Sequence, residues 1–235
     1  MKLFCWQQIP DTTISEILCN TKCTGVFLDA EHSSFSPQQL FSCIQTIKLS
    51  GKKCGVRFTT ADDHLVRVCL DAGIDYAIFS TVNSKEYANK ICNMCRYPRH
   101  GGNRGQGLVR ENLWGLEELD SSNPKVIAMI ETKEGIDILE DLVDMQIDYF
   151  LIGTYDLSAS YGCVGQFDDK KFKNAIEKFK KIVPRDKAAI HLVRNMEEIS
   201  TYNNNFSFFA LAMDTTVILD SYIDIMKEAR SCLDE

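Results

Sequence analysis

The sequence predicts an α/β protein built as a single (β/α)8 barrel, and three observations lead to this prediction. Eight short apolar runs typical of buried strands are spread along the chain, and they alternate with segments that have helical spacing. Such alternation is typical of a parallel sheet. A length of 235 residues suits one domain, over residues 1–235, with eight such units. An open sheet with a dinucleotide site is the alternative, which is weakened because no G-x-G-x-x-G follows the first run.

The apolar runs define the expected strands, each short and bounded by turn or charged residues. In chain order they are Leu3–Trp6, Gly25–Leu28, Lys53–Arg57, Tyr76–Phe79, Val126–Glu131, Tyr149–Ile152, Ala188–Val193 and Phe208–Met213.

Helices are predicted from apolar residues at i, i+3 and i+4 and from capping signals. Ser36-Pro37 reads as an N-cap followed by proline at the first helical position. Asp62 and Ser84 are expected to begin the next two helices, and a final amphipathic helix is expected at about Thr216–Cys232. The other helical patterns lie near Ile14–Leu18, Phe172–Ile182 and Asn195–Tyr202, and the glycine-rich segment Arg96–Gly107 reads as a loop.

The composition argues against two classes of partner. A net charge of −7 disfavours nucleic acid, because neutralising phosphates requires clustered Lys and Arg. No stretch approaches the roughly 20 apolar residues of a membrane-spanning helix. The N-terminal sequence MKLFCWQQIPD lacks the long apolar region of a secretory signal, so we expect a cytoplasmic protein.

Ten cysteines are many for this length, and two pairs are closely spaced, Cys19 with Cys23 and Cys92 with Cys95. A zinc site or a redox pair is one interpretation. The favoured interpretation is small buried apolar side chains that stay reduced, since no matching His/Cys pair has zinc-finger spacing.

Chemically useful side chains are concentrated where the predicted strands end. In a barrel, these carboxyl ends form the active face. The residues at these ends are Asp29, Glu31, His32, Arg57, Glu131, Asp156 and Asp214. This concentration favours an enzyme.

Each candidate also has a structural interpretation. Glu131 and Asp156 can be helix N-caps, but glutamate is a poor N-cap, and two carboxylates at neighbouring strand ends favour a hard divalent cation. Arg57 fits either a structural ion pair or a substrate carboxylate. His32 is either an exposed loop residue or a general base in an acidic cluster.

Six ordered motifs resemble the class II, metal-dependent pyruvate aldolases of the HpcH/HpaI type. They are FLDAEH (Phe27–His32), Val56-Arg57, LDAG (Leu70–Gly73), RYP…RG (Arg96–Gly105), MIETKEG (Met129–Gly135) and LIGTYDLSASYG (Leu151–Gly162). The resemblance runs over nearly the whole chain. It implies a barrel of the phosphoenolpyruvate/pyruvate type.

The resemblance also implies roles for the site residues. Glu131 and Asp156 would bind a divalent cation such as Mg²⁺, Mn²⁺ or Co²⁺. Arg57 would bind the oxo-acid and steady its enolate, and His32, paired with Asp71, would transfer the proton.

The turn Gly153-Thr154-Tyr155 would donate backbone N–H groups to the pyruvate carboxylate. The family often has Gln at the position of Met129 and Pro-Ala at Thr154-Tyr155, so the sequence leaves the substrate open.

The expected activity is reversible cleavage of a 4-hydroxy-2-oxo acid to pyruvate and an aldehyde. The alternatives are an enolate-condensing synthase or acyl-CoA lyase of the same fold, or a non-catalytic protein that binds a metal and an oxo-acid. The resemblance further implies a homo-oligomer, a trimer or hexamer, in which the C-terminal helix at about 216–232 is exchanged between subunits.

Overall fold

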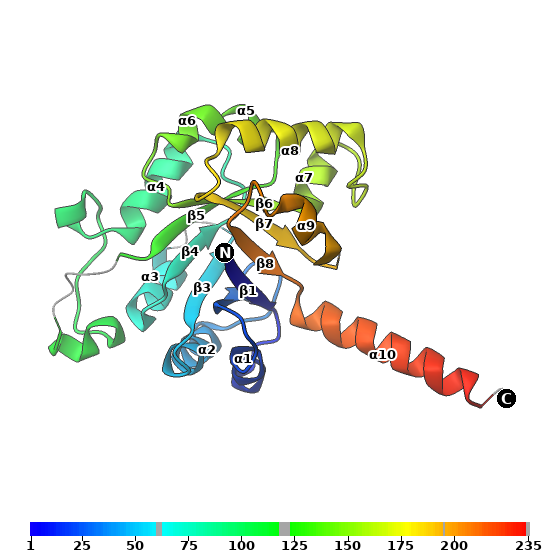
Figure 1. Cartoon of the computed structure of the whole chain (residues 1–235). Coiled ribbons are helices and arrows are strands. Elements are labelled where there is room, and N and C mark those ends of the chain that lie inside the picture. Colours follow the sequence, from blue (N-terminus) through cyan, green and yellow to red (C-terminus); the bar gives the residue numbers. More distant parts are fainter. Residues whose placement is uncertain (60–62, 118–122, 195, 234–235) are drawn as a thin grey trace.

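Eight parallel strands form a closed barrel in the order β1 to β8, with β8 pairing back onto β1 (Figure 1). The structure is a computed structural model that describes residues 1–59, 63–117, 123–194 and 196–233. The strands are β1 (Lys2–Gln7), β2 (Gly25–Asp29), β3 (Lys53–Phe58), β4 (Tyr76–Phe79), β5 (Lys125–Ile130), β6 (Tyr149–Gly153), β7 (Ala188–Leu192) and β8 (Phe208–Leu211). This is the predicted (β/α)8 barrel.

Helices connect successive strands on the outside of the barrel (Figure 1). They are α1 (Thr12–Cys19), α2 (Pro37–Leu49), α3 (Asp63–Ala72), α4 (Lys85–Cys95), α5 (Lys133–Asp137), α6 (Leu139–Val143), α7 (Thr154–Ser160), α8 (Lys170–Ile182), α9 (Ile199–Tyr202) and α10 (Asp214–Ser231). Three short 3-10 helices, η1 (Pro98–His100), η2 (Arg110–Gly115) and η3 (Met196–Glu198), complete the described elements.

The predicted helix starts agree with the structure where they lie in its described part. Ser36 forms a capping box with Gln39, and the Ser84 side chain accepts the N–H of Tyr87. Asp62 and Asn195, also expected at helix starts, lie outside the described residues.

The interior of the barrel is filled by stacked aromatic side chains. Phe4 packs against Phe27 and Phe208, with ring centroids 4.4 and 4.8 Å apart. Gly55 makes room for this packing, because a Cβ there would lie 2.6 Å from the Phe27 ring. A filled interior confines ligand binding to the two ends of the barrel.

The cysteines pack as apolar side chains. Eight of the ten are buried, including Cys19, Cys23, Cys92 and Cys95, and none forms a disulfide. Burial raises the pKa of the Cys95 thiol to about 12. The Cys95 thiol is therefore protonated and unreactive near neutral pH.

The last strand ends earlier than predicted, and Asp214 has a structural role. Its carboxylate accepts the backbone N–H groups of Gln8 and Ile9, at 2.8 and 2.9 Å. Asp214, predicted at the active face, thus fastens the loop after β1 to the start of α10.

Helix α10 extends away from the barrel (Figure 1). Asp214 is its only buried residue. Its exposed large apolar side chains are Val217, Ile218, Leu219, Tyr222, Ile223, Ile225 and Met226. Within the described residues, no helix combines the length and apolar character needed to cross a bilayer.

Candidate active site

A buried ion pair fixes Arg57 at the carboxyl end of the barrel. The register of β2 and β3 places Asp29 opposite Arg57. Arg57 donates from Nε and Nη2 to the two Asp29 carboxylate oxygens, at 2.9 and 2.7 Å, and its Nη1 lies 2.9 Å from Glu31 Oε2. Of the five N–H donors of a guanidinium, these contacts use three and leave two for a ligand.

Asp29 stays charged in this pair. Burial alone would raise its pKa, but the hydrogen bonds and charge of Arg57, with help from Gln8, hold the pKa of Asp29 well below its usual range. The pair is therefore a permanent feature of the site at neutral pH.

Trp6 and His191 form an uncharged floor beneath Arg57. The Arg57 guanidinium lies 4.9 Å from the centre of the Trp6 ring, and Trp6 stacks on His191 with ring centroids 4.4 Å apart. Burial lowers the pKa of His191 to about 4, so its ring is neutral at neutral pH. Neither residue was among the candidates that the sequence placed at the strand ends.

Glu131 follows β5 and is held by only one of its oxygens. Oε1 accepts both the backbone N–H and the hydroxyl of Thr81, at 2.7 and 2.8 Å. Oε2 is buried and has no hydrogen-bond partner in the part of the chain that the structure describes. Burial, reinforced by the charges of Glu31 and Asp156, raises the pKa of Glu131 to about 7 despite the Thr81 bonds.

Asp156 lies in the first turn of α7, directly after β6, and is exposed. Its charge contributes to the raised pKa of Glu131, so the two carboxylates lie near one another. The N-caps of the adjacent helices are other residues: Thr132 caps α5 and Gly153 precedes α7. Neither carboxylate is therefore used as a helix cap.

The donor set suits a hard divalent cation. An unpaired buried carboxylate oxygen among like charges is unfavourable until a cation or a proton neutralises it. Within the described part of the chain, no three His, Cys, Asp or Glu side chains are grouped to hold a metal. Two carboxylates, with the remaining positions left to substrate and water, are the arrangement usual for Mg²⁺.

His32 lies at the rim of the same face. Its side chain is 61% exposed, and its Nε2 is 3.9 Å from Glu31 Oε2. It is therefore accessible to a substrate beside the acidic cluster.

Asp71, the predicted partner of His32, lies elsewhere. It belongs to the last turn of α3, at the end of the barrel opposite the active face, and it contacts Arg104 Nη2 at 3.5 Å. A single chain does not bring Asp71 to His32.

The segment Gly153–Tyr155 forms the wall beside Glu131. A Cβ on Gly153 would lie 2.8 Å from Glu131 Oε2, so a larger residue there would displace this carboxylate oxygen. The Thr154 hydroxyl donates to the His191 carbonyl at 3.2 Å, and Tyr155 packs edge-on against Phe167. The first N–H groups of α7 have no acceptor within the helix, which leaves them open to an anion.

Sequence reasoning missed Ser80 and Thr81. The Ser80 hydroxyl donates to Glu31 Oε2 at 2.7 Å, and Thr81 holds Glu131. A signal was available, because both residues directly follow the fourth apolar run, at the same level as the other strand ends.

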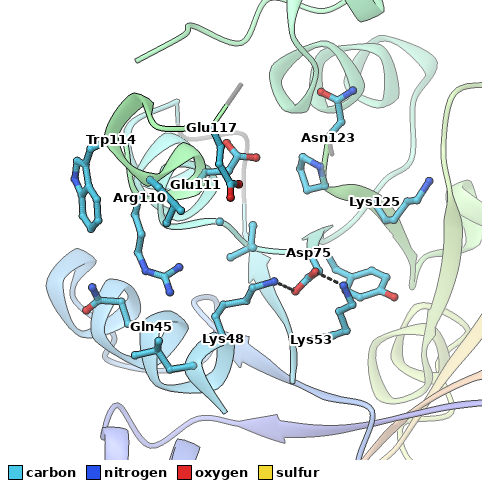
Figure 2. A pocket seen from close by; sticks show the side chains of 16 residues that line it. Gln45, Lys48, Lys53, Asp75, Arg110, Glu111, Trp114, Glu117, Asn123 and Lys125 are labelled. Carbon is cyan, nitrogen blue, oxygen red and sulfur yellow. Dashed lines mark hydrogen bonds and ion pairs between the residues drawn. The ribbon is translucent and has the colours of Figure 1, made fainter. Parts of the chain in front are cut away.

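A cavity of about 750 Å³ lies at the opposite end of the barrel (Figure 2). Figure 2 shows Asp75 between Lys48 and Lys53, which it binds at 2.7 and 2.8 Å. Arg110 donates to the Ala72 carbonyl, and Lys125 pairs with Asp148. These Lys and Arg side chains are thus bound by carboxylate and carbonyl oxygens of the protein itself. None of the predicted site residues lines this cavity.

Comparisons with known proteins identify the family of the chain. The family model described as HpcH/HpaI aldolase/citrate lyase matches residues 2–220. A hydroxypyruvate/pyruvate aldolase of Roseobacter denitrificans is 27% identical over 92% of this chain and 88% of its own length. A 4-hydroxy-2-oxovalerate aldolase of Rhodococcus jostii is 30% identical over 73% of this chain and 68% of its own length.

A solved structure has the same fold. A protein of the HpcH/HpaI aldolase/citrate lyase family from Burkholderia cenocepacia has a TM-score of 0.87 and 20% identity, covering 97% of this chain and 94% of that one. The chain therefore belongs to the HpcH/HpaI aldolase/citrate lyase family, and its aldolase relatives identify it as a carbon–carbon lyase.

Proposed function

We propose that this protein is a metal-dependent aldolase that reversibly cleaves a 4-hydroxy-2-oxo acid to pyruvate and an aldehyde. The observation that carries the proposal is the state of Glu131: one oxygen is fixed by Thr81, and the other is buried, unpaired and close to other carboxylates. Arg57 lies at the same end of the barrel with two N–H donors to spare.

Glu131 and Asp156 would hold the cation, which we expect to be Mg²⁺, Mn²⁺ or Co²⁺. When bound, such an ion supplies Lewis acidity that stabilises negative charge on the oxo-acid. The unpaired Oε2 of Glu131 supports this assignment.

Other groups of the protein would bind the substrate and transfer the proton. Arg57 binds the oxo-acid and stabilises the enolate that cleavage produces. The backbone amides of Gly153-Thr154-Tyr155, where β6 ends and α7 begins, bind the carboxylate. His32 removes the proton from the substrate hydroxyl as the C–C bond breaks, because it is the accessible base at the rim. The role of Asp71 stays a prediction, which Asp71→Asn would test by its effect on cleavage.

Proton exchange on pyruvate tests the proposal. With Mg²⁺ or Mn²⁺, the protein should exchange the methyl protons of pyruvate with D₂O, followed by NMR, and pyruvate with a panel of aldehydes should give products identifiable by mass spectrometry. No exchange with any of the metals would contradict an aldolase and favour a non-catalytic binding protein.

We predict that His32→Ala keeps metal binding and loses cleavage by about 10²–10⁴-fold, the usual contribution of a general base. Cleavage is measured from pyruvate release. His100→Ala is the control, because His100 lies in the loop after α4 and bonds Asn123. Unchanged cleavage in His32→Ala would exclude His32 as the base.

We further propose that the chain forms a homo-oligomer, a trimer or hexamer, through α10. Exposed apolar side chains along one helix that extends from the barrel support this proposal. Tyr222→Glu combined with Ile223→Glu should reduce the assembly to monomers in sedimentation analysis. A change of charge on α8, Lys173→Glu, should leave the assembly intact.

We place the protein in the cytoplasm, where unpaired thiols stay reduced.

A further inference from the structure

Two hydroxyl residues, Ser80 and Thr81, follow β4 and separate two carboxylates of the site. Ser80 donates its hydroxyl to Glu31 Oε2, an oxygen that also pairs with Arg57. Thr81 donates to Glu131 on the other side. Within the described residues, Glu31 Oε2 is therefore satisfied by Arg57 and Ser80, whereas Glu131 keeps a buried oxygen without a hydrogen-bond partner.

Thr81 places both of its donors on the same oxygen of Glu131. Its backbone N–H is 2.7 Å and its hydroxyl 2.8 Å from Oε1. Gly153 lies against the other oxygen, Oε2, and allows it to stay there only because it has no side chain. The orientation of the carboxylate is thus fixed: Oε1 accepts both bonds from Thr81, and Oε2 is left to bind a cation.

The backbone of Thr81 is in an unfavourable conformation. Its φ is +52°, in the left-handed region that β-branched residues rarely adopt. Such conformations persist where the surrounding contacts determine them, and they are concentrated at functional sites. Among the described residues, the hydrogen bonds of Thr81 are the two to Glu131.

We infer that Thr81 is a positioning residue for the metal site: its hydroxyl and backbone N–H orient Glu131 so that Oε2 is presented to the divalent cation. The inference rests on the proposed function, because it presupposes that Glu131 binds a cation. Thr81 does not contact the ion or the substrate in this role. Hydrogen bonds to metal-binding side chains typically contribute 10–100-fold to metal affinity.

Calorimetric titration of the protein with Mn²⁺ tests the inference. Thr81→Val removes the hydroxyl at nearly constant shape and should weaken Mn²⁺ binding by about 10–100-fold. Thr81→Ser keeps the hydroxyl and should restore most of the affinity. Thr81→Gly also lacks the hydroxyl, and glycine accepts a positive φ without strain, so this variant should fold even if Thr81→Val does not.

A merely structural role for Thr81 predicts a different pattern. Thr81→Gly would then change the melting temperature and leave the Mn²⁺ affinity of the folded protein as it is. Ser84→Ala is the matched control: it removes a hydroxyl that caps α4 three residues away, so it should lower stability without changing Mn²⁺ affinity.

The outcomes separate the two proposals. If the wild-type protein binds Mn²⁺ and both Thr81→Val and Thr81→Gly bind it equally well, the role of Thr81 is wrong and the metal site stands. If the wild-type protein binds no divalent cation, the proposed function fails, and the role of Thr81 fails with it.

Discussion

Glu131→Gln should abolish Mn²⁺ binding and cleavage, and it should remove a large pH dependence from the stability of the metal-free protein. The introduced amide can still accept the Thr81 bonds through its carbonyl oxygen, but it has no charge to offer a cation. We expect cleavage to fall by at least about 10³-fold, as when one major electrostatic contribution to a transition state is lost.

The sign of the stability effect follows from the raised pKa. In the folded protein the pKa of Glu131 is about 7, and its ordinary value is 4.5. Above pH 7 the ionised carboxylate destabilises the folded state, and this penalty disappears as the pH falls from 7 to 4.5. Its full size is about 3 kcal/mol. The stability of Glu131→Gln relative to wild type should therefore rise by about that amount between pH 4.5 and 8.

Urea unfolding of both proteins without metal, at pH 4.5 and at pH 8, measures this difference. Glu134→Gln is the control, because Glu134 lies in the first turn of α5, three residues further along the chain. If the free energies of unfolding of wild type and Glu131→Gln differed by the same amount at both pH values, the pKa of Glu131 would not be raised in the folded protein.

Arg57→Ala should cost both stability and activity. It removes the cation that pairs with Asp29, a residue with no exposed surface. Leaving a buried charge without its partner costs about 3–5 kcal/mol. Cleavage should fall by about 10³-fold, because the oxo-acid loses its guanidinium.

A second variant separates these two losses. Arg57→Met combined with Asp29→Asn removes both charges at similar volume, so it should recover much of the stability in urea unfolding and none of the cleavage. The exposed pair Lys85–Asp141 is the control, since Lys85→Ala should cost less than about 1 kcal/mol. Equal stability of Arg57→Ala and wild type would contradict an anchoring pair.

The sequence was sufficient to predict the barrel and several of the residues that lie at the carboxyl ends of its strands. Apolar runs alternating with helical patterns determine the topology, and the carboxyl ends of parallel strands share one face. Arg57, Glu131 and Asp156 lie at that face for this reason.

Other features depend on three-dimensional contacts that a linear pattern does not contain. Thr81 reads as an ordinary turn residue until its φ and its bonds to Glu131 are known. Asp214 has the right position in the sequence, but its carboxylate is used by the backbone of the loop after β1. The role of Asp71 was implied by the family resemblance. A resemblance in sequence gives the position of a residue in the chain but not the end of the barrel at which it lies.

The neutral His191 beneath Arg57 has a consequence for the behaviour of the metal-free protein in acid. With its pKa lowered from 6.5 to about 4, His191 makes folding less favourable as acidity increases across that interval. Glu131 has the opposite effect over nearly the same interval. The contributions of these two buried groups to the pH dependence of the free energy of unfolding therefore offset each other. Replacing either residue alone would leave the pH dependence that the other one causes.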